Sequence, residues 1–252
     1  MKVLSVVGTS KSGKTTTIEK IIEGLKKRGY SVGSVKEIHY EKFAIDQEGT
    51  NTYRHKMAGA DPVTARGYKE TDILFGKSLD IEDILAFYKN DYVIMEGVTE
   101  SSCPIILCAH SKEDIEDKKN EQYFKRVFLI SGVAASCMQE YKGLRAIDAI
   151  KDAGGLIDII EDEVFERLPD FPPDCCSACG SSCRELSSRI LKGKAEREDC
   201  VLHKASITLK VNEKEIPIVP FVQGLLRDSI LALVKNLKGC EKPSKISIKI
   251  FD

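Results

Sequence analysis

The sequence lacks tryptophan, an excess of charge of one sign, and any long apolar run. Its 38 basic and 39 acidic residues give a formal net charge of −1, so no overall field attracts nucleic acid or an anionic membrane. No segment approaches the roughly 20 apolar residues of a membrane span. The first apolar run breaks at Gly8, too early for a signal peptide. We therefore expect a soluble, cytoplasmic protein without nucleic-acid or membrane partners.

Short apolar runs and helical patterns alternate over about the first 165 residues, which is typical of an α/β fold with a mostly parallel sheet covered by helices. Helical spacing is clearest at residues 14–27, where Ile18, Ile21 and Leu25 share one face. It is weaker at residues 81–88 and 144–153. The expected strands are residues 3–7, 31–35, 62–65, 72–75, 92–95, 104–108 and 127–130.

The segment from Gly8 to Thr15, GTSKSGKT, matches the pattern G-x-x-x-x-G-K-[ST] and lies between an expected strand and an expected helix. We call these eight residues the phosphate loop. Glycines in such a loop let backbone N–H groups surround phosphate oxygens, and the helix adds the positive end of its dipole. Lys14 would reach the β- and γ-phosphates, and Thr15 would give a hydroxyl ligand to Mg²⁺. The predicted nucleotide-binding residues are Gly8, Ser10, Ser12, Gly13, Lys14, Thr15 and Thr16.

Two acidic residues are candidates to complete the Mg²⁺ site and, with Lys14, to act in catalysis. Glu96 ends the apolar strand pattern DYVIMEG, where a carboxylate at the strand's carboxyl end would face the phosphates. A charge on a strand that looks buried seldom goes unpaired, which favours a functional role. Asp46 lies in the loop after the second expected strand, and there a plain solvated acid is an equally good interpretation.

The composition changes near Leu168, where prolines that cannot continue a helix precede a cluster of cysteines. We predict three parts: a P-loop NTPase domain at residues 1–168, a four-cysteine module at residues 169–205, and a small α+β unit at residues 206–252. The third part should contain a hairpin at residues 206–211 and 215–219, a helix at residues 221–237 and an alternating run at residues 245–251.

Residues 36–61, KEIHYEKFAIDQEGTNTYRHKMAGAD, follow the phosphate loop and precede the MEGV segment at residues 95–98. In this order the motifs resemble those of the MobB family, P-loop GTPases associated with molybdenum cofactor guanylylation. The family's K-H-x-H-H stretch reads KEIHY here, its F-D-x-D retains only the second acid, Asp46, and its V-E-G-F reads MEGV. The resemblance covers about residues 1–160.

The resemblance implies that Gly13, Lys14, Thr15 and Thr16 bind nucleotide phosphates, and that Asp46 and Glu96 serve the metal or its water. It also implies that Arg54 and His55 lie near the site. The expected activity is GTP binding and slow or partner-activated hydrolysis, in support of molybdenum or tungsten pterin cofactor synthesis. The expectation that the base is guanine rests on the resemblance alone, because no N-K-x-D motif stands in a suitable loop. ATP therefore remains an alternative nucleotide.

A second group of candidate ligands consists of four cysteines, Cys176, Cys179, Cys183 and Cys200. Four thiolates suit a [4Fe-4S] cluster or a structural zinc ion, and spacing alone does not decide between them. The segment, with a helix and a glycine turn before the fourth cysteine, resembles the [4Fe-4S] module of Rnf-type B subunits and corrinoid iron–sulfur proteins. Cys175 adjoins the first ligand and could replace it.

The pairing of a nucleotide site with four cysteines supports an alternative function. In it the protein is a nucleotide-gated iron–sulfur electron carrier or a metallocluster assembly factor that uses ATP or GTP. A protein partner in cofactor synthesis or electron transfer is expected, and the apolar helix near the end of the chain suggests a homodimer. Cys103, which follows Glu96 in the sequence, is a further candidate for the nucleotide site.

Overall fold

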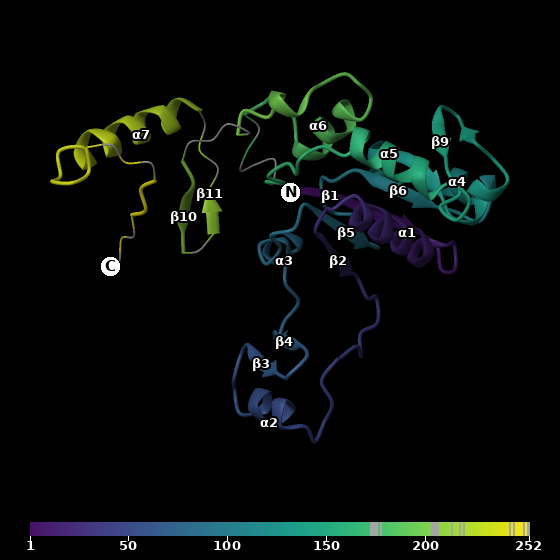
Figure 1. The fold of residues 1–252 in the computed structure, drawn as a ribbon, viewed down its shortest axis with the longest axis horizontal. Coiled ribbons are helices and arrows are strands. Elements are labelled where there is room, and N and C mark those ends of the chain that lie inside the picture. Colours follow the sequence, from purple (N-terminus) through teal and green to yellow (C-terminus); the bar gives the residue numbers. More distant parts are fainter. Residues whose placement is uncertain are drawn as a thin grey trace. The chain divides into compact units, whose positions relative to one another are not determined.

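The structure is a computed structural model that divides into two compact units, Met1–Glu166 and Arg167–Asp252. Figure 1 shows the course of the chain. The residues it describes are 1–171, 176, 178–202, 207–212, 214–216, 218, 220–241, 243, 245–248 and 250.

A seven-stranded sheet forms the centre of the first unit, and its strand order is β2-β5-β1-β6-β7-β9-β8. All neighbouring pairs are parallel except β8 and β9. This confirms the predicted α/β fold with a mostly parallel sheet. The strands are β1 (Lys2–Gly8), β2 (Val32–Lys36), β5 (Tyr92–Glu96), β6 (Ile105–Cys108), β7 (Val127–Ser131), β8 (Glu140–Tyr141) and β9 (Leu144–Ala146).

Alternate residues of these strands pack against helices on the two faces of the sheet. Leu4 and Val6 of β1 share a buried cluster with Leu25 of α1 (Lys14–Lys27) and Leu156 of α5 (Ala153–Glu163). The odd-numbered apolar residues of β1, β5 and β6 lie in two other buried clusters. These contain Leu85 of α3 (Ile81–Leu85) and Ile115 of α4 (Lys112–Lys118). Two 3-10 helices, η1 (Gln122–Arg126) and η2 (Val133–Ser136), flank β7.

The strands expected at residues 62–65 and 72–75 exist, but they are not part of the parallel sheet. They form an antiparallel hairpin, β3 (Val63–Arg66) with β4 (Thr71–Leu74), closed by the bond from Gly67 N to Glu70 O at 2.9 Å. A short turn joins antiparallel neighbours, whereas a parallel pair needs a long crossover. Helix α2 (Asn51–Met57) packs against β3, and the three elements form an arm between β2 and α3 (Figure 1).

The prediction of a helix at residues 144–153 is wrong. Leu144, Ile147 and Ile150 have helical spacing, but residues 144–146 form β9, which pairs with β7 and β8. The helix begins only at Ala153, because Asp152 caps it by accepting a hydrogen bond from Gly155 N at 2.8 Å. Pairing with an existing sheet edge outweighs a three-residue helical pattern.

The second unit contains α6 (Cys183–Ile190), η3 (Arg197–Asp199), the hairpin of β10 (Leu209–Val211) with β11 (Lys214–Ile216), and α7 (Pro220–Val234). The predicted hairpin and final helix are thus confirmed, with shorter strands. The alternating run is not a strand at residues 245–248 or 250. In the described part of the chain, no helix has the length and hydropathy needed to cross a membrane.

Candidate functional site

The phosphate loop connects the carboxyl end of β1 to the first turn of α1. Gly13 adopts a left-handed conformation (φ 97°) at the start of the helix, which only glycine adopts without strain. No acidic residue lies in the first turn of α1, so the positive end of the helix dipole is not neutralised. Lys14 Nζ donates to Thr9 O at 2.6 Å, and the side chains of Thr15 and Thr16 are exposed. The loop is therefore shaped to receive an anion.

The segment after β6 holds the phosphate loop from one side. Asp114 Oδ2 accepts hydrogen bonds from Thr9 Oγ1 at 3.1 Å and from His110 N at 3.0 Å. The ring of His110 contacts Ser10 O through Nε2 at 2.9 Å. Sequence reasoning missed these two residues, because Asp114 lies in a charged helix that looks like a solvated surface.

The segment after β7 holds the loop from the other side. Val133 N donates to Ser12 O at 3.1 Å. Gly132, with φ 75°, approaches so closely that a Cβ atom there would lie 2.1 Å from Ser12 O. Ser12 is fully buried, and its hydroxyl donates to Thr9 O at 2.9 Å. The backbone of the phosphate loop is thus fixed on both sides.

Glu96 ends β5, the strand beside β1, and is 8% exposed. Its carboxylate forms an ion pair with Lys36 at the end of β2. The register places Glu96 opposite Val6, two residues before the phosphate loop begins. The sequence identified Glu96 but not its partner, because Lys36 lies 60 residues away in the chain.

Asp46 is not a plain solvated acid. Its Oδ1 accepts hydrogen bonds from Thr50 Oγ1 at 2.7 Å and Thr52 Oγ1 at 2.9 Å, which together lower the pKa of the carboxyl group, Thr50 most strongly. Its Oδ2 is buried and has no hydrogen-bond partner. Thr50 also caps α2, on which Arg54 and His55 are exposed. Asp46 therefore belongs to the start of α2, in the arm shown in Figure 1, and among the described residues no contact joins it to the phosphate loop.

A polar chain runs under the phosphate site, from α1 to the end of β9. Cys108 Sγ lies 3.5 Å from Thr17 Oγ1, which is 3.3 Å from Ser131 Oγ. Ser131 Oγ in turn donates to Ile147 O at 2.8 Å. Burial raises the pKa of the Cys108 thiol to about 11, so it is neutral. Cys103 lies elsewhere, in the buried cluster that contains Leu85.

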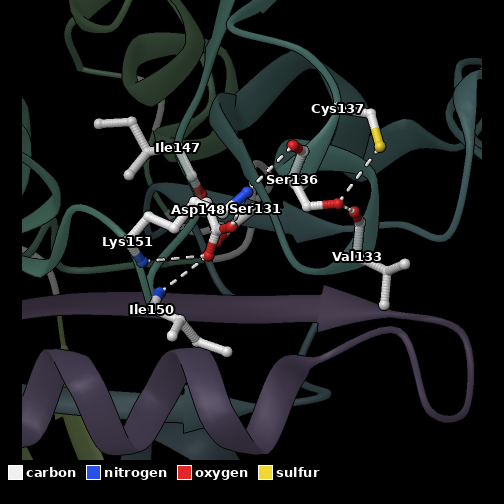
Figure 2. A network of polar contacts seen from close by, with 8 residues as sticks. All are labelled: Ser131, Val133, Ser136, Cys137, Ile147, Asp148, Ile150 and Lys151. Carbon is white, nitrogen blue, oxygen red and sulfur yellow. Dashed lines mark hydrogen bonds and ion pairs between the residues drawn. The ribbon is translucent and has the colours of Figure 1, made fainter.

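The loops after β7 and β9 meet in the network drawn in Figure 2. Asp148 Oδ1 accepts hydrogen bonds from Ile150 N at 2.9 Å and Lys151 N at 3.3 Å, and Oδ2 lies 3.4 Å from Lys151 Nζ. Lys151 Nζ also donates to Ser136 O at 3.4 Å. These backbone bonds help to lower the pKa of the Asp148 carboxyl group, although burial acts in the opposite direction as the largest single effect.

The four predicted metal-binding cysteines lie in the second unit. Cys183 and Cys200 are buried, Cys176 and Cys179 are partly exposed, and Cys175 lies outside the described residues. Burial is the main cause that raises the pKa of the Cys183 thiol to about 11, and the neighbouring Asp170 and Cys200 act in the same direction through their charges. Among the described residues, no three His, Cys, Asp or Glu side chains come together as a metal-binding group. The expected helix and glycine turn before Cys200 are present, since α6 is followed by Gly193 with φ 63°.

Comparison with known proteins adds evidence on the family. Residues 3–131 match the family described as "MobB: Molybdopterin guanine dinucleotide synthesis protein B". A putative molybdopterin-guanine dinucleotide biosynthesis adapter protein of Methanocaldococcus jannaschii is 30% identical over 99% of this chain and 97% of its own length. A probable adapter protein of the same description from Bacillus subtilis is 31% identical over 45% of this chain and 68% of its own.

A solved structure agrees with these sequence matches. The crystal structure of Bacillus subtilis MobB superposes on this chain with a TM-score of 0.53 at 25% sequence identity. The superposition covers 66% of this chain and 100% of the Bacillus subtilis chain. The likeness to that structure thus extends over about two thirds of this chain. The M. jannaschii protein, in contrast, matches over nearly the full length of both chains.

Proposed function

Since this chain belongs to the MobB family, we propose that it binds GTP with Mg²⁺, hydrolyses it slowly or on contact with a partner, and assists molybdenum or tungsten pterin guanine dinucleotide synthesis or delivery. ATP is the alternative nucleotide. The observation that carries the proposal is the phosphate loop, held on both sides and followed by a helix whose first turn contains no acid.

In this proposal each residue of the loop has a distinct task. The backbone N–H groups near Gly13 surround the β-phosphate. Lys14 exchanges its present acceptor, Thr9 O, for the β- and γ-phosphate oxygens. As the bond between the γ-phosphorus and the β–γ bridging oxygen breaks, the electron pair stays on that oxygen and water takes up the γ-phosphoryl group. The ammonium group of Lys14 stabilises the negative charge that develops on the departing β-phosphate.

The residues present fit a Mg²⁺ ion. Mg²⁺ prefers oxygen ligands, usually one or two from protein together with phosphate and water. Thr15 offers an exposed hydroxyl, and Glu96 offers a carboxylate on the strand beside the loop. Asp46 is bonded to Thr50 and Thr52 at the start of α2, in the arm that stands away from the sheet (Figure 1), so the fit rests on Thr15 and Glu96. Bound Mg²⁺ would draw charge from the phosphates and would compete with Lys36 for Glu96.

The test is nucleotide binding by the full chain and by a Lys14→Ala variant, with Lys26→Ala as the control. Lys26 is an exposed lysine in the last turn of the same helix, so its loss changes the net charge equally. We expect the wild type and Lys26→Ala to bind GTP with Mg²⁺ equally well, and Lys14→Ala to bind at least about tenfold more weakly. Failure of the wild type to bind either GTP or ATP would refute the proposal.

We also propose that Cys176, Cys179, Cys183 and Cys200 hold a [4Fe-4S] cluster, with zinc as the alternative. The support is the cysteine spacing and the buried Cys183 and Cys200 at the ends of the helix-and-turn segment. Iron, sulfide and zinc analysis of anaerobically purified protein tests it. About four irons and four sulfides per chain would favour the alternative function of a nucleotide-gated electron carrier or cluster assembly factor, whereas one zinc would indicate a structural site.

A further inference from the structure

The phosphate loop and Glu96 fix the direction in which a bound nucleotide must extend. Glu96 lies on β5, on one side of β1, and under the function proposed above it serves the metal at the γ-phosphate. The base is at the opposite end of a nucleoside triphosphate, so it must lie over β6, β7 or β9. At the end of β6, Asp114 and His110 already bind the loop through Thr9 and Ser10. The ends of β7 and β9 therefore remain for the base.

These two ends are joined to the phosphate loop by direct bonds. Val133, after β7, contacts Ser12 O, and Ser131 contacts both Thr17 of α1 and Ile147 after β9. Lys151 then connects the β9 loop back to Ser136. Figure 2 shows Ser131, Ser136, Ile147 and Lys151 of this network, together with the hydrogen bonds that Asp148 accepts from Ile150 and Lys151. The loop that contains Asp148 is thus a fixed neighbour of the phosphate site.

Asp148 has the chemistry of a base-reading group. Its side chain is 16% exposed, and two backbone N–H groups hold Oδ1 in place. Oδ2 is 3.4 Å from Lys151 Nζ, longer than the roughly 2.7–2.9 Å of a strong charged hydrogen bond. Lys151 is 69% exposed, so it can move into solvent when a ligand arrives. An ionised carboxylate only accepts hydrogen bonds.

We propose that the carboxylate of Asp148 accepts hydrogen bonds from N1–H and N2–H₂ of guanine and thereby selects GTP over ATP. Adenine presents an acceptor, N1, where guanine presents a donor. Adenine N1 and the carboxylate oxygen would then face each other as two acceptors without a hydrogen between them. An aspartate at this position supplies the discrimination that the missing N-K-x-D motif would otherwise provide. The proposal rests on nucleotide binding by the phosphate loop.

The test measures the affinities of the full chain for GTP, ATP and xanthosine triphosphate with Mg²⁺, before and after Asp148→Asn. An asparagine amide can donate to the C2 carbonyl of xanthine while its oxygen accepts from N1–H. We expect wild-type protein to prefer GTP to ATP. In Asp148→Asn we expect GTP affinity to fall roughly 10- to 100-fold and xanthosine triphosphate affinity to rise. ATP affinity should not fall, because the amide no longer opposes adenine N1 and can donate to it. Asp162→Asn, an exposed acid on α5, is the control of equal charge.

Each failure has a separate meaning. If Asp148→Asn binds GTP as well as the wild type, Asp148 does not read the base and the inference is wrong, while the proposed GTP binding stands. An equal loss of GTP and ATP affinity would also overturn it, because the residue would then act on the fold of the loop. Absence of binding by the wild type would refute the proposed function itself.

Discussion

At the scale of single residues, the ion pair of Glu96 with Lys36 joins two side chains of very different exposure. The carboxylate is nearly buried, whereas the lysine is about half exposed. Removal of the lysine therefore leaves a buried charge without its partner, which costs more free energy than the intact pair contributes. Both residues end strands of the same sheet, so the cost appears at the edge where the phosphates would bind.

We predict that Lys36→Met lowers the free energy of unfolding by about 1–3 kcal/mol, because the Glu96 carboxylate loses its charged partner. Adding Glu96→Gln should recover part of the loss, since no buried charge remains. Urea unfolding of the two single variants and the double variant measures the coupling, and Lys36→Arg serves as the charge-preserving control. Additive effects of the two substitutions would show that the pair makes no energetic contribution.

A second residue-scale prediction concerns pH. Burial raises the pKa of Cys108 from 9.0 to about 11, so the folded state favours the neutral thiol. This contribution is complete below about pH 9 and is lost as the pH rises toward 11. The wild type should therefore lose about 2 kcal/mol more than Cys108→Ala between about pH 7.5 and pH 10.5. Urea unfolding across this range tests it, and equal slopes for both proteins would contradict it.

At the scale of elements, the sequence predicted those whose local pattern agrees with their packing. The α1 helix follows from the apolar face of Ile18, Ile21 and Leu25, which is the face buried in the core. The stretch from Leu144 to Ile150 has the same kind of spacing, but an open edge of β7 determines its structure. Strand pairing between distant segments leaves no trace in a local pattern.

The residues of the candidate site likewise divide into those of a local motif and those that only the fold brings together. The phosphate loop is a contiguous motif, so its residues could be identified directly. Lys36 and Asp114 bind Glu96 and Thr9, which are distant from them in the chain. No spacing rule identifies them, because the sheet order that brings them together is a property of the whole fold.

The close approach of the β7–η2 turn to the phosphate loop gives a prediction at this scale. In Gly132→Ala the new Cβ would lie 2.1 Å from Ser12 O, so the loop must shift, and we expect GTP affinity to fall at least about tenfold. Gly143→Ala is the control, because Gly143 has a similar φ of 85° but open space around it. It should cost only about 1–2 kcal/mol of backbone strain. Equal GTP affinity in the two variants would contradict the prediction.

At the scale of the whole molecule, the division after Glu166 assigns the phosphate loop to the first unit and the four predicted metal-binding cysteines to the second. The residues proposed to bind nucleotide all precede it, and the four predicted metal ligands all follow it. The core cluster around α1 and α5, from Leu4 to Val164, likewise lies within the first unit. We therefore expect that each proposed activity can be measured without the other.

We predict that a chain ending at residue 168 folds and binds GTP within about threefold of the full-length affinity, because the site and its core lie within the first unit. Its iron and zinc content should fall to background, since Cys176, Cys179, Cys183 and Cys200 are absent. Circular dichroism, nucleotide titration and metal analysis of both chains provide the comparison. A truncated chain that folds but binds GTP much more weakly would place part of the nucleotide site in the second unit.

The bonds that fix the phosphate loop through Asp114 and Val133 also have a kinetic consequence. A loop that is already in shape needs no ordering step before it captures its ligand. Association should then be a single encounter, and its observed rate should rise linearly with nucleotide concentration instead of reaching a plateau. Residence time, and with it the length of any signal to a partner, would be governed by the rate at which the nucleotide leaves.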